Sequence, residues 1–137
     1  MDAFFTRYPK EAELETRTAT VEGDGDVPPG TYAFLELFCP DVSCDCRRVV
    51  ISVLSREREA AVATLNYGWD NVGFYRKWSG NDPMAPLMKG VTLEPSGTQS
   101  PEAEAFRQLF RDVLLADPRY RTRIQKHYRM FKKWKPI

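Results

Sequence analysis

The sequence RVVISVLS, residues 48–55, decides the fold class of this chain. It is short and carries β-branched residues on both faces, which predicts a buried strand. Two stretches of the same kind flank it, TYAFLELF at 31–38 and AVATLNY at 61–67. The links between the three are short, whereas parallel neighbours would need long crossovers. We therefore predict an antiparallel β-meander, to which residues 13–21 add an edge strand.

Two helices are expected at the C-terminal end. Ser100 and Pro101 form a typical helix start, with a hydroxyl N-cap and a proline at the first helical position. Asp117 and Pro118 start a second helix in the same way. Apolar residues recur at helical spacing in both segments, which marks the faces that pack on the core. They are Phe106, Leu109, Phe110, Val113 and Leu114 in the first helix, and Tyr120, Ile124, Tyr128 and Phe131 in the second.

The predicted fold is therefore α+β, an antiparallel β-meander of three to four strands with two C-terminal helices packed on it. The length of 137 residues suits a single domain, 1–137, with a loosely ordered start over residues 1–13. The middle of the chain predicts a short helix around 72–78 and an extended piece within 87–93. No stretch approaches the roughly 18 apolar residues of a membrane-spanning helix, and the N-terminus lacks the features of a secretory signal. We expect no membrane association and a cytoplasmic location.

All three cysteines fall within eight residues, Cys39, Cys44 and Cys46, in a C-x4-C-x-C pattern. Thiolates converge on zinc because its tetrahedral geometry and softness favour sulfur, so the spacing predicts a structural zinc site. The only histidine, His127, is a candidate for the fourth ligand, as are Asp41, Asp45 and water. Two other interpretations stay open: reduced thiols without a ligand, and a redox or disulfide role.

The run FCPDVSCDCRRV at 38–49, followed by NYGW at 66–69, resembles a cysteine knuckle found in a family of uncharacterised bacterial proteins. That resemblance implies a small bacterial protein and carries no assigned activity. The C-x-C pair is also similar to the start of a SWIM-type zinc finger. That finger continues with a later C-x-H pair, and this chain has no later cysteine.

The formal net charge of +1 hides an uneven distribution of charge along the chain. Residues 1–46 hold ten acids and three bases, a net of −7, and residues 47–137 hold nine acids and seventeen bases, a net of +8. The last twenty residues contain eight bases and no acid. This pattern indicates either an exposed basic surface for an anionic partner or pairing between the two ends of the chain.

The second C-terminal helix is accordingly the best candidate for partner binding, because its bases can neutralise phosphates. Its rings follow one helix face, so we expect them to be buried rather than to stack on bases. The candidate binding residues are Arg119, Arg123, Lys126, Arg129, Lys132 and Lys133. The partner is expected to be nucleic acid or an acidic protein surface.

Three function classes follow from these observations. The first is a zinc-stabilised binding or interaction module, with no catalytic residues assigned. The second is a cysteine-based redox protein or enzyme, and the third is nucleic-acid binding through the basic C-terminal helix. The sequence contains no P-loop, no G-x-G-x-x-G and no G-x-S-x-G motif, so it gives no positive indication of the nucleotide-binding and hydrolase classes that those motifs mark.

Overall fold

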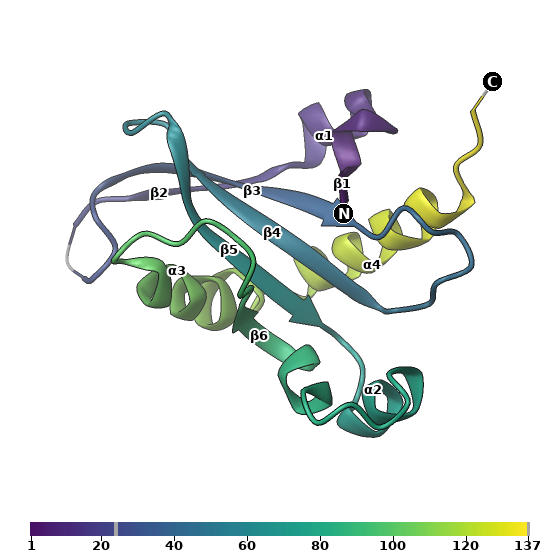
Figure 1. Cartoon of the computed structure of the whole chain (residues 1–137). Helices are drawn as coiled ribbons and strands as arrows, with labels where there is room; N and C mark the ends of the chain where they lie inside the picture. The colour runs from purple at the N-terminus through teal and green to yellow at the C-terminus, as the bar shows by residue number, and fades with distance from the viewer. Residues whose placement is uncertain (24, 137) are drawn as a thin grey trace.

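The computed structural model describes residues 1–23 and 25–136, and its centre is one antiparallel sheet of six strands (Figure 1). The strand order is β1-β3-β4-β5-β6, and β2 pairs with the other end of the β3 edge that β1 occupies. The bounds of the strands are β1 Asp2–Ala3, β2 Arg17–Val21, β3 Gly30–Phe38, β4 Arg48–Ser55, β5 Ala60–Gly68 and β6 Gly90–Leu93.

Helices cover one face of this sheet. The first helical segments are η1 Phe4–Thr6 and α1 Pro9–Glu15, and the middle of the chain forms α2 Val72–Trp78 and η2 Ala85–Met88. The C-terminal part forms α3 Ala103–Leu109, a π-helical turn η3 Phe110–Leu114, and α4 Pro118–Lys133. Figure 1 shows α3 and α4 on the same side of the sheet, with α2 beyond the end of β5.

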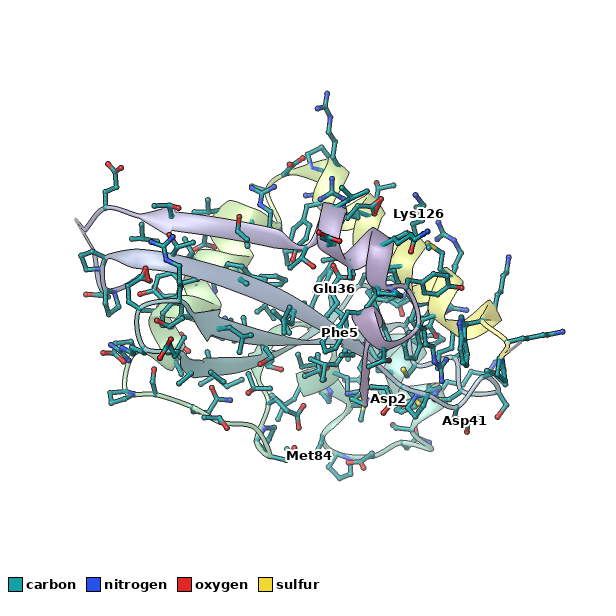
Figure 2. All side chains as sticks on the ribbon, turned by 90° about the horizontal axis from the view of Figure 1, so that it is seen from above. Asp2, Phe5, Glu36, Asp41, Met84 and Lys126 are labelled. Carbon is teal, nitrogen blue, oxygen red and sulfur yellow. The ribbon has the colours of Figure 1, made fainter. Side chains whose placement is uncertain are left out.

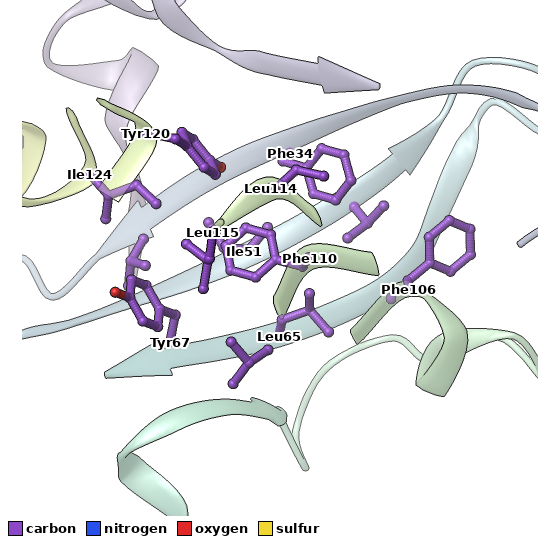
Figure 3. Close-up of a cluster of buried hydrophobic side chains, with 14 of the residues drawn as sticks. Phe34, Ile51, Leu65, Tyr67, Phe106, Phe110, Leu114, Leu115, Tyr120 and Ile124 are labelled. Atoms are coloured by element: carbon purple, nitrogen blue, oxygen red, sulfur yellow. The ribbon is translucent and has the colours of Figure 1, made fainter. Parts of the chain in front are cut away.

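The core lies between the sheet and the α3–α4 layer. Strand residues point alternately to the two faces, so every second residue of β3 is buried against the helices. Phe34, Ile51 and Leu65 meet Phe110, which the π-helical turn carries (Figure 3). The other labelled members of this cluster are Tyr67, Phe106, Leu114, Leu115, Tyr120 and Ile124.

The structure confirms the predicted α+β class and the packing of the C-terminal helices on the sheet. The three central strands lie where the sequence predicts them, but the sheet has six strands rather than three to four. Of the further strands, β2 lies within the edge strand predicted over 13–21 and β6 within the extended piece predicted within 87–93, whereas β1 has no counterpart in the sequence prediction. Asp117 caps α4 as expected, whereas α3 begins at Ala103, two residues later than Pro101 predicts.

The first thirteen residues, for which the sequence predicts loose order, contact both the sheet and α4. Phe4 is buried in the core, and the Tyr8 hydroxyl donates to the Met130 carbonyl at 2.7 Å. Arg7 donates to the Phe131 carbonyl and lies 3.9 Å from the centre of the Phe131 ring. These two donors satisfy carbonyls in the last turn of α4, which have no partner within the helix. The N-terminal segment therefore closes the C-terminal end of α4.

The packing of η2 and α2 on the end of β5 can be tested at Gly68. A Cβ atom at Gly68 would overlap the Met88 carbonyl oxygen and the Tyr75 hydroxyl, because η2 and α2 both pack directly on this residue. We expect Gly68→Ala to lower the free energy of unfolding by about 2–3 kcal/mol, the usual cost of overpacking a dense site. Chemical denaturation measures this change.

Gly25→Ala is the matched control, because a Cβ atom there meets nothing within 4 Å. We expect a change of less than about 0.5 kcal/mol for this control. Equal effects of the two substitutions would contradict the close contact of η2 and α2 with β5.

Candidate functional site

The three cysteines lie in the loop that joins β3 to β4. A tight turn organises this loop: the Asp41 carboxylate accepts hydrogen bonds from the backbone N–H and the hydroxyl of Ser43, at 2.9 and 2.7 Å. The N–H of Cys44 donates to the Asp41 carbonyl at 3.1 Å. Lys132 on α4 reaches the loop from the other side, and its Nζ donates to the carbonyls of Cys39 and Asp41 at 2.9 and 2.8 Å. The loop is therefore attached to α4, which carries a large share of the basic residues.

The three thiols are free and adjacent. Cys46 is buried, Cys39 and Cys44 are half-buried, and the Cys44 thiol lies beside both of the others. Burial, together with the neighbouring sulfurs, raises the pKa of Cys44 to about 11. Burial also opposes ionisation of Cys39, but the Asp41 backbone N–H and the Lys132 charge outweigh it and lower the pKa of that thiol. Cys39 is thus the thiol best suited to act as a nucleophile.

The structure does not group His127 with these cysteines. Among the described residues, 1–23 and 25–136, no set of three or more His, Cys, Asp or Glu side chains is arranged to hold a metal ion. Both ring nitrogens of His127 are already engaged by carboxylates, so neither is available to a metal beside the thiolates. Zinc on Cys39, Cys44 and Cys46 stays a prediction, as does a redox role for the loop.

Arg47, directly after the cysteine loop, connects three elements. Its φ of 47° lies in the left-handed region, which is uncommon for residues other than glycine. The guanidinium pairs with Asp45 and Asp70 at 2.9 and 2.7 Å and lies 4.1 Å from the centre of the Phe74 ring. The pKa of Arg47 is raised by its bonds to these carboxylates, so the side chain stays charged.

The backbone of Arg47 is held as well. Its N–H donates to the Tyr128 hydroxyl of α4 at 3.2 Å, and its carbonyl accepts from the Tyr75 hydroxyl of α2 at 2.8 Å. The Tyr128 hydroxyl in turn donates to Asp45. Two tyrosines from separate helices therefore fix the end of the loop, which accounts for the unusual backbone conformation of Arg47.

His127 lies in the centre of a buried ion cluster. Its Nδ1 is 2.7 Å from Glu36 on β3, its Nε2 is 2.6 Å from Glu15 on α1, and its ring stacks on Phe4 with centroids 4.1 Å apart. The side chain of His127 is 1% exposed and that of Glu36 is 4% exposed, while Glu15 is 28% exposed. Figure 2 shows Glu36 beneath the N-terminal helical segment.

The electrostatics of this cluster favour a charged imidazole. Burial alone would lower the pKa of His127, but the hydrogen bonds and negative charges of Glu36 and Glu15 outweigh it and raise that pKa. The hydrogen bond to His127 holds the pKa of Glu15 below its usual value. A charged imidazole donates from both nitrogens, one to each carboxylate, which satisfies all three groups.

Sequence reasoning missed Glu15 and Glu36 as partners of His127. One signal was present: in the segment 31–38, the two-residue period of a strand places Glu36 on the same face as Phe34 and Phe38. A carboxylate on an apolar face must be paired, because an isolated buried charge is costly. The sequence alone does not say which cation pairs with it.

The six bases predicted to bind a partner fall into two sets. Arg123 and Lys132 turn toward the protein, where they donate to the carbonyls of Glu15, and of Cys39 and Asp41. Arg119, Lys126, Arg129 and Lys133 are exposed along the outer side of α4, and Figure 2 labels Lys126 there. The helix rings Tyr120, Tyr128 and Phe131 are buried, as the sequence predicts.

Comparison with protein-family models, with curated proteins and with solved structures gives no match for this chain. Within the described ranges, none of the helices combines the length and the apolar character that crossing a membrane would require.

The reactivity of Cys39 tests the geometry of the cysteine loop. In metal-free protein, Cys39 should react with iodoacetamide near neutral pH faster than Cys44, because its pKa is lowered while that of Cys44 is raised. We expect Lys132→Ala to slow alkylation of Cys39 roughly threefold, since it removes the nearby positive charge. Peptide mapping by mass spectrometry measures each rate.

Lys133→Ala is the matched control, because Lys133 is exposed and its neighbour Lys132 makes the bonds to the loop. Faster alkylation of Cys44 than of Cys39 would contradict the assignment. Slow alkylation of all three thiols that a chelator accelerates would instead show that metal protects them, and elemental analysis of the same sample would identify it.

The pH dependence of stability tests the ion cluster. The folded-state pKa of His127 is raised above its unfolded value, so its contribution is fully present below about pH 6.5 and is lost as the pH rises through the folded-state pKa. We expect His127→Gln to lower the free energy of unfolding by about 3 kcal/mol at pH 6. The difference between the two proteins should shrink as the pH rises.

Urea denaturation between pH 6 and pH 10 measures this difference, because titrating groups that do not contact His127 contribute equally to both proteins. A difference that stays constant over the whole range would show that His127 is neutral in the folded protein. The contribution of Glu15 to stability has the opposite pH dependence. Because the pKa of Glu15 is lowered in the folded protein, this residue stabilises the fold at pH values above its unfolded-state pKa, and the stabilisation is lost on acidification.

Proposed function

We propose that this protein is a binding module that contacts the phosphate backbone of a nucleic acid through the outer face of α4. The observation that carries the proposal is a row of exposed bases, Arg119, Lys126, Arg129 and Lys133, with no salt bridge to a carboxylate in the described part of the chain. Their spacing of seven, three and four residues places them along one side of the helix.

The bases of this row lack the carboxylate partners that many other basic residues have. Many other arginines are paired with carboxylates, among them Arg17 with Asp117 and Arg58 with Glu102. Further pairs join Arg47 to Asp45 and Asp70, Arg107 to Glu104, and Arg111 to Asp112. The acidic N-terminal half therefore contacts α4 at His127 and through backbone carbonyls, and leaves the outer bases unneutralised.

The composition of this face favours nucleic acid over an acidic protein. Every exposed residue of α4 is polar or a terminal proline, and the rings of the helix point into the core. Protein interfaces usually centre on aromatic or apolar anchors, which this face does not offer. A row of bases covering about 21 Å of helix instead matches the repeating charge of a phosphate backbone, whose contacts carry no sequence information.

The salt dependence of binding tests the proposal. Four phosphate contacts predict that log K for a duplex of random sequence falls with log salt with a slope of about −3 to −4. We expect Lys126→Ala/Arg129→Ala to weaken binding at low salt and to reduce the slope by about 2. Fluorescence anisotropy with a labelled duplex measures both quantities.

Arg76→Ala/Lys89→Ala is the matched control, because it removes one arginine and one lysine that are exposed elsewhere on the surface. It should leave the slope almost unchanged. Equal losses of affinity in the two double variants would show that binding depends on net charge alone and not on the outer face of α4. Absence of binding at low salt, with retention on an acidic protein surface, would replace nucleic acid by a protein partner.

A further inference from the structure

A cavity of about 490 Å³ lies at the η2 and β6 edge of the sheet, away from the outer face of α4. Its walls come from the ends of β4 and β5, from η2, from β6 and from α3. The volume lies within the range of sites that hold small molecules. The residues that matter most for its chemistry are Arg48, Asn66, Met84, Leu87, Met88 and Thr92.

The cavity wall is fixed to the sheet by hydrogen bonds. The Asn66 amide donates to the Met88 carbonyl at 3.1 Å, and the Thr92 hydroxyl donates to the Leu87 carbonyl at 3.0 Å. Gly68 allows the same Met88 carbonyl to approach β5 directly. The segment η2 is therefore held against β5 and β6 from two strands, so the cavity is formed before any ligand arrives.

Arg48 is a cation without a counter-ion in this cavity. Its Nη1 donates to the Asn66 side-chain oxygen at 3.2 Å, and its guanidinium carbon lies 5.5 Å from the centre of the Trp78 ring. Within the described ranges it forms no salt bridge, and its Nε is buried with no hydrogen-bond partner. An unsatisfied buried donor is rare in folded proteins, so part of the hydrogen-bonding capacity of Arg48 is unused.

The other charged groups of the lining are partly satisfied. Arg107 is paired with Glu104 through two close contacts and also donates to the Val91 carbonyl. Glu94 accepts from the Ser96 hydroxyl at 3.0 Å. These bonds leave Arg48 as the cation that faces the cavity without a charged partner, which selects a ligand with a negative head.

The opposite wall is apolar and exposed. Met84 and Leu87 are each about half exposed, at 52% and 51%, and Met88 lies beside them. Figure 2 shows Met84 at the periphery of the molecule, on the loop that carries η2. Large apolar side chains that stay exposed around a cavity are typical of binding sites, and methionine adapts to ligands of different shape.

We propose that this cavity binds a small organic carboxylate whose apolar body covers Met84, Leu87 and Met88 and whose carboxylate pairs with Arg48. The guanidinium can offer two parallel donors to a carboxylate, a geometry that an amine or an alcohol does not match. Asn66 holds the guanidinium in place through its side-chain oxygen. The site is separate from the proposed nucleic-acid face, and either can exist without the other.

Octanoate, octylamine and 1-octanol test this site, because the three probes share an apolar chain and differ in head charge. Titration of the ¹⁵N-labelled protein should show saturable shifts at Met88 and Thr92 with octanoate, at about millimolar concentration for a ligand of this size. Octylamine and 1-octanol should bind at least about tenfold more weakly, since they lack the charge-assisted bonds. Shifts at other positions, or equal binding of the three probes, would overturn the proposal.

Two variants separate the charged and the apolar parts of the site. Arg48→Met should abolish the preference for octanoate over 1-octanol. Leu87→Ser should weaken the binding of both octanoate and 1-octanol by a similar factor. Arg56→Met is the matched control, because Arg56 is exposed on the turn between β4 and β5 and lies outside this cavity. Octanoate preference retained in Arg48→Met would overturn the role of Arg48, and Arg48→Lys keeps the charge if the Met variant is unstable.

Discussion

A buried histidine held between two carboxylates is the constraint on which the arrangement of this protein depends. His127 cannot leave the interior without exposing Phe4, and Glu36 cannot lose its partner without becoming an isolated buried charge. The three ionisable groups come from α1, β3 and α4, so satisfying them fixes the N-terminal helix and the C-terminal helix on the same strand. Buried ion pairs of this kind add little net stability but are costly to break, which makes them effective at specifying one arrangement.

The side chains of α4 differ between the side that faces the His127 cluster and the side that faces solvent. On its inner side the helix carries buried rings and the imidazole, and at its margins Arg123 and Lys132 bind backbone carbonyls. On its outer side Lys126 and Arg129 are exposed and form no salt bridge with a carboxylate of residues 1–23 or 25–136. The net of −7 in the first third of the sequence and +8 in the rest therefore do not cancel by direct pairing. Among the described residues, the ion pairs between the two parts of the chain join His127 to Glu15 and Glu36, Arg47 to Asp45, and Arg17 to Asp117, and the outer bases of α4 stay exposed.

Local patterns in the sequence were enough to predict the central strands and the last helix. The segments 31–38, 48–55 and 61–67 have unbroken apolar or alternating patterns, and the stripe from Tyr120 to Phe131 has one helical period. Of the short edge strands, β1 could not be predicted because its two residues carry no periodicity of their own, whereas β2 and β6 lie within the wider ranges 13–21 and 87–93 that the sequence predicts. For the start of the chain, the sequence predicts loose order and shows only that Phe4, Phe5 and Tyr8 are able to dock on the core. The docking of Phe4 itself depends on His127, which lies more than a hundred positions away.

In the candidate site too, the sequence predicts local neighbours but not partners that are distant along the chain. The spacing of the cysteines indicates a local cluster, and the structure brings the three thiols together. The histidine was assigned to that cluster because it is the only one in the chain, whereas its true neighbours lie 91 and 112 residues away and are acids. Partners at such separations are set by the topology of the sheet and helices, which no motif encodes.

The protonation state of His127 tests the central claim most directly. Because the chain has one histidine, its two imidazole nitrogens give unambiguous signals in a ¹⁵N NMR spectrum. At pH 6, below the ordinary pKa of histidine, both nitrogens should have the shifts of an imidazolium, and both ring N–H protons should be protected from exchange. One nitrogen with the shift of an unprotonated ring would contradict the buried ion cluster and the arrangement of α1, β3 and α4 that depends on it.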